Sequence, residues 1–308
     1  MGDLCAGRVV IVTGAGRGIG RAEALGFAAE GAKVVVADIG VELDGSGATA
    51  SVGQGVVDEI VALGGEAVLS TADVGDSTGA KEIFDLALDT FGGIDIIVNN
   101  AGILRDKMIF NMDEADFDAV IRVHLKGTFN LNRLGAIYWR ERNKEGLEND
   151  ARIINTSSPA GLYGNVGQQN YSAAKAGAAA MVIGLARELG RYGVTANAIS
   201  PGARTRMTDS IPRPGGAAPV PTDGPDLRGP ENVAPLVVWL GSSEAKDVTG
   251  QVFEVGGGHI AVAEGWRHGP GVDSETTWVP SELGPLVTKI VSEAYQVPVP
   301  GGPRPSSN

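Results

Sequence analysis

The chain has 308 residues, which is enough to bury a full hydrophobic core and within the size that α/β proteins reach as one domain. Its net charge of −12 disfavours nucleic acids and anionic membrane surfaces as partners. No apolar run approaches the ~20 residues of a membrane-spanning helix, the single cysteine, Cys5, excludes an internal disulfide, and no Cys/His cluster suggests a metal site. We therefore expect a soluble globular protein without metal.

The chain begins MGDLCAGRVVIVTG, where a short polar leader runs directly into an apolar segment. This lacks the basic region and the longer apolar stretch of a secretory signal. The chain ends in Pro-Ser-Ser-Asn rather than in the Ser-Lys-Leu peroxisomal address. We therefore expect a cytoplasmic protein.

Short apolar runs alternate with segments of helical periodicity. The runs that predict strands are 8–14, 33–38, 66–71, 94–102, 152–158, 194–202 and 251–258. The segments that predict helices are 18–31, 52–64, 77–91, 112–142, 170–192 and 231–241. The runs are too uniformly apolar to have a wet face, so the pattern predicts an α/β fold, a Rossmann-like doubly wound parallel sheet with helices on both sides.

Three segments depart from this alternation. Residues 40–51 lengthen the loop after the second strand, and a Pro/Gly-rich substrate loop is expected at about 204–230, because long loops in compact domains commonly cover binding sites. Residues 263–308 follow the last predicted strand, and their Pro-rich end is expected to be flexible. The sequence thus predicts one domain over 1–262 with a C-terminal extension over 263–308.

A glycine-rich turn, TGAGRGIG at 13–20, follows the first strand and opens the first helix. Such a turn allows a pyrophosphate to approach the helix N-terminus, although a turn without a ligand fits it as well. Asp38 ends the second strand, where an acid can bond the adenosine ribose. It would repel the 2′-phosphate of NADP by about 4 kcal/mol at ~4 Å, whereas Arg17 could attract that group. We favour Asp38 and predict NAD.

Two further motifs have ordinary alternatives when taken alone. Asn99-Asn100-Ala101-Gly102 ends the fourth strand, either as a plain turn or as a ligand contact at the carboxyl edge of the sheet. Tyr171 and Lys175 are spaced i,i+4 and share one helix face, as many surface pairs do.

In this order, TGAGRGIG, NNAG, a serine before Tyr-x-x-x-Lys, and Pro-Gly after the sixth strand resemble the classical short-chain dehydrogenases over residues 7–262. The resemblance implies that Tyr171 is the general base, that Lys175 lowers its pKa and bonds the nicotinamide ribose, and that Ser158 bonds the substrate oxygen. A tyrosine that titrates near ~10 must fall to about 7–8 for this, which an ammonium at ~4 Å can supply. The implied cofactor contacts are Gly14, Arg17, Gly18, Ile19, Gly20, Asp38, Asp73, Val74, Asn100, Ala101, Gly102, Lys175, Pro201, Gly202 and Thr205.

The sequence departs from the family pattern at two places. His124 stands where most members have an asparagine that holds a proton-relay water, and it either takes over that relay or only packs. Thr205 comes one residue earlier than the threonine that usually contacts the nicotinamide carboxamide.

A narrower resemblance rests on NNAGILRD, RVHLKGTF, NTSSPAGLYGNVGQQNYSAAKAG, VAPLVVWL and QVFEVGGG. These segments are similar to the (3R)-hydroxyacyl-CoA dehydrogenase domain of peroxisomal multifunctional enzyme type 2 and its bacterial relatives. The similarity implies oxidation of a 3-hydroxyacyl-CoA, a steroid side-chain thioester among the candidates, by a homodimer or homotetramer. Arginines 204, 206, 213 and 228 either meet CoA phosphates or are simply solvated.

Two alternatives stay open. The first is a hydroxysteroid or other secondary-alcohol dehydrogenase, and the second is a catalytically silent dinucleotide-binding interaction protein. A hydrolase is disfavoured, because the chain has no Gly-x-Ser-x-Gly nucleophile elbow.

Overall fold

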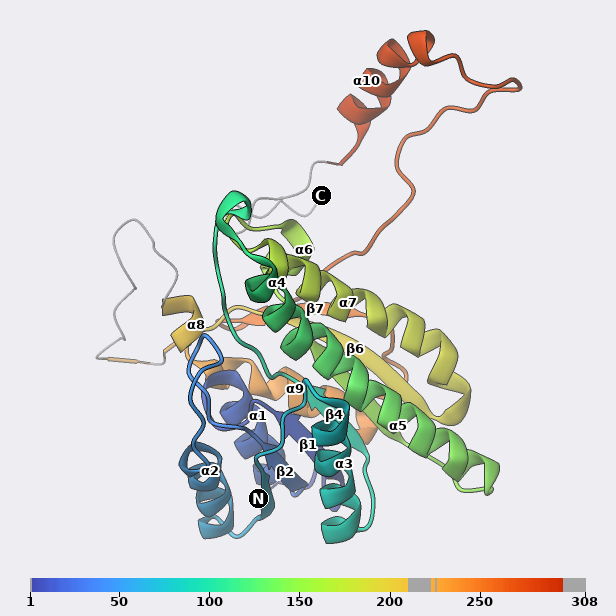
Figure 1. Cartoon of the computed structure of the whole chain (residues 1–308). Helices are drawn as coiled ribbons and strands as arrows, with labels where there is room; N and C mark the ends of the chain where they lie inside the picture. The colour runs from blue at the N-terminus through green and yellow to red at the C-terminus, as the bar shows by residue number, and fades with distance from the viewer. Residues whose placement is uncertain (1, 210–222, 225, 296–308) are drawn as a thin grey trace. The chain divides into compact units, whose positions relative to one another are not determined.

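The computed structural model describes residues 2–209, 223–224 and 226–295 (Figure 1). The strands are β1 (Val9–Thr13), β2 (Lys33–Ala37), β3 (Glu66–Ser70), β4 (Ile96–Asn99), β5 (Ala151–Thr156), β6 (Val194–Pro201), β7 (Val252–Gly256) and β8 (His259–Val262). The α-helices are α1 (Gly18–Ala29), α2 (Ser51–Ala62), α3 (Ser77–Phe91), α4 (Glu114–Ile121), α5 (Gly127–Lys144), α6 (Pro159–Tyr163), α7 (Gln169–Leu189), α8 (Arg206–Asp209), α9 (Ala234–Gly241) and α10 (Leu283–Glu293). Short 3₁₀ turns include η1 (Ile109–Asn111) and η4 (Pro230–Asn232), and a π-helical turn, η2, spans Arg122–Lys126.

The strands form one sheet in the order β3-β2-β1-β4-β5-β6-β7-β8. Every neighbouring pair from β3 to β7 is parallel, whereas β7 and β8 are antiparallel. The predicted Rossmann-like doubly wound fold is therefore confirmed, with the correction that an unpredicted antiparallel strand closes one edge. The side chains of β8 are half-buried and exposed in alternation, so they form no continuous apolar run.

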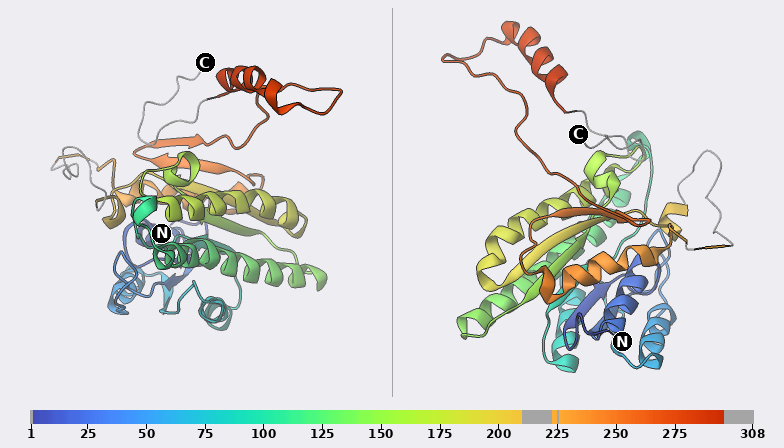
Figure 2. Two further views of the ribbon diagram at one scale, coloured as in Figure 1. Left: turned by 45° about the horizontal axis from the view of Figure 1, so that its top comes forward. Right: turned by 180° about the vertical axis from the view of Figure 1, so that it is seen from behind.

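Two hydrophobic clusters lie on opposite faces of the sheet. One contains Phe27 of α1, Ile60 of α2 and Leu236 of α9. The other contains Ile83 of α3 and residues of α5 and α7. Figure 1 shows α3, α5 and α7 on the near side of the sheet, and the view from behind in Figure 2 shows α1 in blue and α9 in orange on the other side. The uniformly buried strands β1, β4 and β5 thus have a helix layer on each face.

The segment predicted as one helix over 112–142 consists of α4, the π-helical turn and α5. π-Helical turns inside helices recur at functional sites, and this one carries the buried His124. A sequence pattern of apolar residues does not distinguish such a turn from regular helix.

By its contacts the chain divides into a unit over Met1–Ala263, which holds the sheet, and a unit over Glu264–Asn308, which holds α10. The sequence does not predict α10, and the Pro-rich end that it predicts as flexible lies outside the described residues. No helix in the described part of the chain has the length and apolar character that crossing a bilayer requires.

Candidate active site

The carboxyl ends of β1 and β4 are joined by one hydroxyl group. Thr13 Oγ1 accepts hydrogen bonds from the backbone N–H groups of Asn100 and Ala101, both at 3.0 Å. Asn100 Nδ2 in turn donates to the carbonyls of Thr13 at 3.0 Å and Gly14 at 3.3 Å. The glycine-rich turn and NNAG, which are 87 residues apart at these contacts, therefore form one rigid surface. Thr13 was not predicted as a site residue, although its hydroxyl stands directly before the glycines.

The glycine-rich turn is closely packed. A side chain at Gly20 would place its Cβ 2.3 Å from the Gly14 carbonyl oxygen, so only glycine fits there. Asp38 holds the turn from β2, because its carboxylate accepts the N–H of Gly16 at 2.7 Å and that of Gly40 at 2.6 Å. Ile19 packs against the cluster under α1.

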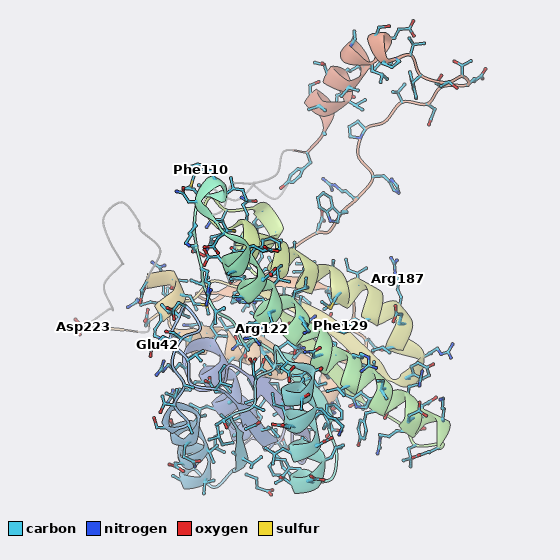
Figure 3. The ribbon with its side chains drawn as sticks, viewed as in Figure 1. Glu42, Phe110, Arg122, Phe129, Arg187 and Asp223 are labelled. Carbon is cyan, nitrogen blue, oxygen red and sulfur yellow. The ribbon has the colours of Figure 1, made fainter. Side chains whose placement is uncertain are left out.

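The start of α1 fits a dinucleotide pyrophosphate. Its N-cap residue, Arg17, makes no side-chain capping bond, so the N–H groups of the first turn remain for an anion. Arg17 Nη1 lies 3.9 Å from Glu42 Oε1, while the other Glu42 oxygen lies 3.2 Å from Arg206 Nη1. Figure 3 shows Glu42 on the loop after β2. That loop thus connects the glycine turn with α8.

The segment after β3 is engaged in contacts within the protein. Asp73 accepts the N–H of Gly75 at 2.8 Å and pairs at 2.6 Å with Arg122, which is labelled in Figure 3. The side chain of Val74 is buried, and its carbonyl accepts a hydrogen bond from Asn130 at 2.9 Å. Both predicted residues lie at the carboxyl edge of the sheet, with Asp73 engaged in protein contacts.

The segment after β6 faces the glycine turn. Pro201 is in register with Val255, whose carbonyl accepts the N–H of Gly202 at 2.8 Å. A Cβ built on Gly18 would lie 3.6 Å from Thr205 Cγ2. Thr205 therefore lies beside the start of α1, although it comes one residue earlier than in the common pattern.

Tyr171 and Lys175 lie on the same face of α7. Lys175 Nζ lies 5.7 Å from the centroid of the Tyr171 ring, and it donates to the carbonyl of Thr156 at 2.7 Å. Ser158 caps α6 by accepting the N–H of Ala160 at 3.2 Å, and its side chain also hydrogen-bonds with Tyr171. Ser157 Oγ donates instead to the Lys175 carbonyl at 2.8 Å. The structure thus assembles Ser158, Tyr171 and Lys175 at the carboxyl edge.

Burial dominates the electrostatics of this group. Burial raises the pKa of Tyr171 to about 12, against a hydrogen bond from Ser158 that lowers it, and the charge of Asp106 raises it further. Burial also lowers the pKa of Lys175 to about 7, against the Glu23 carboxylate, which raises it. At neutral pH these surroundings therefore hold Tyr171 as a phenol.

His124 lies against the tyrosine. The two rings meet edge to face, with centroids 5.0 Å apart and planes at 87°. His124 Nε2 lies 3.0 Å from the Ile103 nitrogen and 2.8 Å from its carbonyl oxygen, so the tautomer decides which contact is a hydrogen bond. Burial and then the charge of Lys175 hold the pKa of His124 well below its ordinary value, which makes the imidazole neutral.

Gly102 makes room for the His124 ring, because a Cβ there would lie 2.1 Å from His124 Cε1. We expect Gly102→Ala to lower the free energy of unfolding by about 1–3 kcal/mol, the usual cost of overpacking. The matched control is Gly184→Ala in α7, where a Cβ meets nothing within 4 Å; there alanine should be neutral or stabilise by up to ~1 kcal/mol. Urea denaturation measures both, and equal midpoints for the two variants would contradict the packing.

Three buried asparagines fix α5 and α7 against the sheet. Asn99 Nδ2 donates to Asn132 Oδ1 at 2.8 Å and to Asn155 Oδ1 at 3.0 Å. Asn155 Nδ2 donates to the carbonyl of Ala178 in α7 at 3.2 Å. This network sets the position of the helix that carries Tyr171. Asn99 and Asn155 lie in segments that carry the family resemblance, whereas Asn132 lies in none of them and an isolated asparagine gives no signal of its own.

The arginines predicted near CoA phosphates are partly engaged already. Arg204 pairs with Asp226 at 3.0 Å, and Arg206 pairs with Glu42. Arg228 is exposed, and Arg213 lies outside the described residues. Two of the three described arginines are therefore paired with carboxylates within the protein.

The chain belongs to the short-chain dehydrogenase family, whose model matches residues 8–214. The chain is 46% identical to the hydroxyacyl-CoA dehydrogenase ChsB1 of Mycobacterium tuberculosis, covering 90% of this chain and 86% of that protein. It is 44% identical to peroxisomal multifunctional enzyme type 2 of Mus musculus over 82% of this chain, which is 32% of the mouse protein. The crystal structure of a short chain dehydrogenase from Mycobacterium avium superposes with a TM-score of 0.85 at 58% identity, covering 96% of this chain and 98% of that one.

The sequence predicts a resemblance to the short-chain dehydrogenases and a narrower one to peroxisomal multifunctional enzyme type 2 and its bacterial relatives. Both are confirmed. The protein is a short-chain dehydrogenase/reductase, an oxidoreductase of a family that typically binds a nicotinamide dinucleotide.

Proposed function

We propose that the protein oxidises the hydroxyl group of a 3-hydroxyacyl-CoA to the ketone with NAD. The observation that carries this proposal is the grouping of Ser158, Tyr171 and Lys175 at the carboxyl edge of the sheet. Ser158 orients the substrate oxygen by hydrogen bonding, and Tyr171 accepts its proton. When bound, the nicotinamide ring is the hydride acceptor.

The tyrosine needs additional positive charge to act as a base. Burial raises its pKa to about 12, far above the value that suits a base at neutral pH. Lys175 lowers that pKa only while it is an ammonium ion, and burial works against that form. Proton abstraction at Tyr171 therefore depends on the charge state of Lys175, which the protein must control.

The choice of NAD over NADP is proposed from Asp38, whose carboxylate is held at the glycine turn by two N–H groups. We expect Asp38→Ala to reduce the preference for NAD by at least ~10-fold, because the repulsion of a 2′-phosphate disappears. The ratio of kcat/KM with NAD to kcat/KM with NADP measures this. Asp89→Ala on α3, an exposed position, is the control, and a ratio that both variants leave unchanged would mean that another residue reads the ribose.

The CoA thioester as substrate is proposed from the named activity of the relative from Mycobacterium tuberculosis, a hydroxyacyl-CoA dehydrogenase. A hydroxysteroid or another secondary alcohol is the alternative substrate for the same catalytic group. A panel of 3-hydroxyacyl-CoA thioesters of different chain length, including a steroid side-chain thioester, should be compared with free secondary alcohols at equal concentration. Higher kcat/KM on the free alcohols would favour the alternative, and NAD binding without any turnover would favour an interaction protein.

We propose a homodimer or homotetramer as the assembly. Large apolar side chains are exposed along η1, α4 and α5, and Phe110 at 76% and Phe129 at 51% exposure are labelled in Figure 3. Exposed apolar side chains on successive elements favour association with another protein surface. Light scattering of the purified chain tests this, and a monomer at micromolar concentration would contradict it.

A further inference from the structure

Glu23 is a fully buried carboxyl group to which the proposed reaction assigns no role. It lies in α1 with 0% exposure, and both of its carboxyl oxygens lack a hydrogen-bond partner among the described residues. Its neighbours on the buried face of α1, Ala24 and Phe27, belong to an apolar cluster. An apolar side chain would fit this face without the desolvation that a carboxyl group suffers, so packing alone does not explain a glutamate here.

Glu23 lies on α1 on the side that faces the sheet, near the elements that carry the active site. Glu23 follows Gly20 by one helical turn on the same face, and Gly20 faces the Gly14 carbonyl and the Asn100 side chain. Thr156 ends β5 and lies on the same side of the sheet as Ile154, which packs in the cluster with α1. Its Oγ1 is also buried without a partner among the described residues, while its carbonyl accepts the hydrogen bond from Lys175 Nζ at 2.7 Å.

The charge of Lys175 lowers the pKa of Glu23, and the charge of Glu23 raises the pKa of Lys175. The other elements around α1 contribute little: α9 has no ionisable side chain, Glu59 of α2 pairs with Arg21, Lys33 of β2 pairs with Glu66, and Asp58 of α2 and Glu231 of η4 are exposed. Around Lys175 the remaining titratable groups are Tyr171 and the neutral His124, while Asp106 acts on the tyrosine. Among the described residues, the charges of the carboxyl group and the amine therefore influence each other through the buried interior, without a hydrogen bond between them.

We propose that Glu23 is a positioning residue of the active site, whose buried carboxyl group sets the charge of Lys175 and thereby the pH range in which Tyr171 acts as a base. The inference rests on the role proposed above for Lys175. Burial raises the pKa of Glu23 to about 8 while Lys175 lowers it, so both members of the pair exchange protons close to neutral pH. Once Glu23 is ionised, its charge stabilises the ammonium form of Lys175.

The first test is the pH profile of kcat/KM for Glu23→Gln, which keeps the shape of the side chain and removes its charge. Without the carboxylate the pKa of Lys175 falls, so the ammonium is lost at lower pH. We expect the alkaline limb to move down by about one pH unit, a shift typical of removing a nearby opposite charge. Glu82→Gln on α3, an exposed position, is the matched control and should keep the wild-type profile.

The second test reads the carboxyl group directly and needs no turnover. Infrared difference spectra of wild type against Glu23→Gln should contain the band of a protonated carboxyl that disappears around pH 8. In Lys175→Met this band should persist to higher pH, because the ammonium that favours the carboxylate is gone. An unmoved alkaline limb in Glu23→Gln, or a band whose titration Lys175→Met leaves in place, would overturn the proposal. An inactive wild type would contradict the proposed function, while the infrared result would still decide the pairing.

Discussion

Tyr171→Phe should lower kcat by at least ~10²-fold while NAD affinity stays within about twofold, because the change removes one hydroxyl from α7 and leaves the glycine turn intact. General bases typically contribute 10²–10⁴-fold to the rate. The hydroxyl that is lost is the group hydrogen-bonded with Ser158, and the ring that remains still packs edge to face on His124. Turnover is followed as NADH formation, and NAD affinity is measured by titration calorimetry.

The comparison needs a tyrosine outside the site. Tyr138 in α5 packs edge to face on Phe84 at 5.8 Å, as Tyr171 packs on His124, so Tyr138→Phe is a matched control for the loss of a hydroxyl. It should retain near-wild-type turnover. If Tyr171→Phe turned over as fast as Tyr138→Phe, another group would have to be the base.

Lys175→Met should lower kcat/KM by roughly 10²-fold. At the observed 5.7 Å between Nζ and the tyrosine ring, an ammonium stabilises a phenolate by about 3 kcal/mol in an effective dielectric of about 20, which corresponds to this factor. We also expect a higher KM for NAD, because the resemblance assigns Lys175 to the nicotinamide ribose. Steady-state kinetics with varied NAD separate the two effects.

A second lysine controls for the loss of charge. Lys81→Met in α3 removes an exposed ammonium group that pairs with Asp85. This variant should change neither kcat/KM nor the KM for NAD. If Lys175→Met kept full kcat/KM across the pH range, neither the base mechanism nor the role of the Glu23–Lys175 pair would hold.

The strands and most helices could be predicted from the sequence, because buried parallel strands read as apolar runs and their helices keep an apolar face. Strand β2, for example, is expected at 33–38 and spans Lys33–Ala37. Strand β8 and helix α10 could not be predicted, since β8 lies at the sheet edge with alternating exposure and α10 has no buried residue. The π-helical turn around His124 has the same residue pattern as a regular helix.

The candidate site was predictable where residues stand in short motifs, as Tyr171, Lys175 and Asp38 do. It was not predictable where a single polar residue owes its environment to the fold. Glu23 lies two residues after Arg21 in the same helix, and the sequence gives no sign that Arg21 is half-buried and Glu23 fully buried. The roles of the motif residues remain predictions that the variants above test.

The most direct test of the proposed function is the growth of NADH absorbance when the purified protein and NAD receive a (3R)-3-hydroxyacyl-CoA, with the (3S) epimer and a 17β-hydroxysteroid in parallel. We predict NADH formation with the (3R) thioester and at least ~10²-fold slower formation with the other two. Turnover of the steroid with none of the (3R) thioester would contradict the proposed substrate, and turnover of none of the three would contradict the proposed reaction.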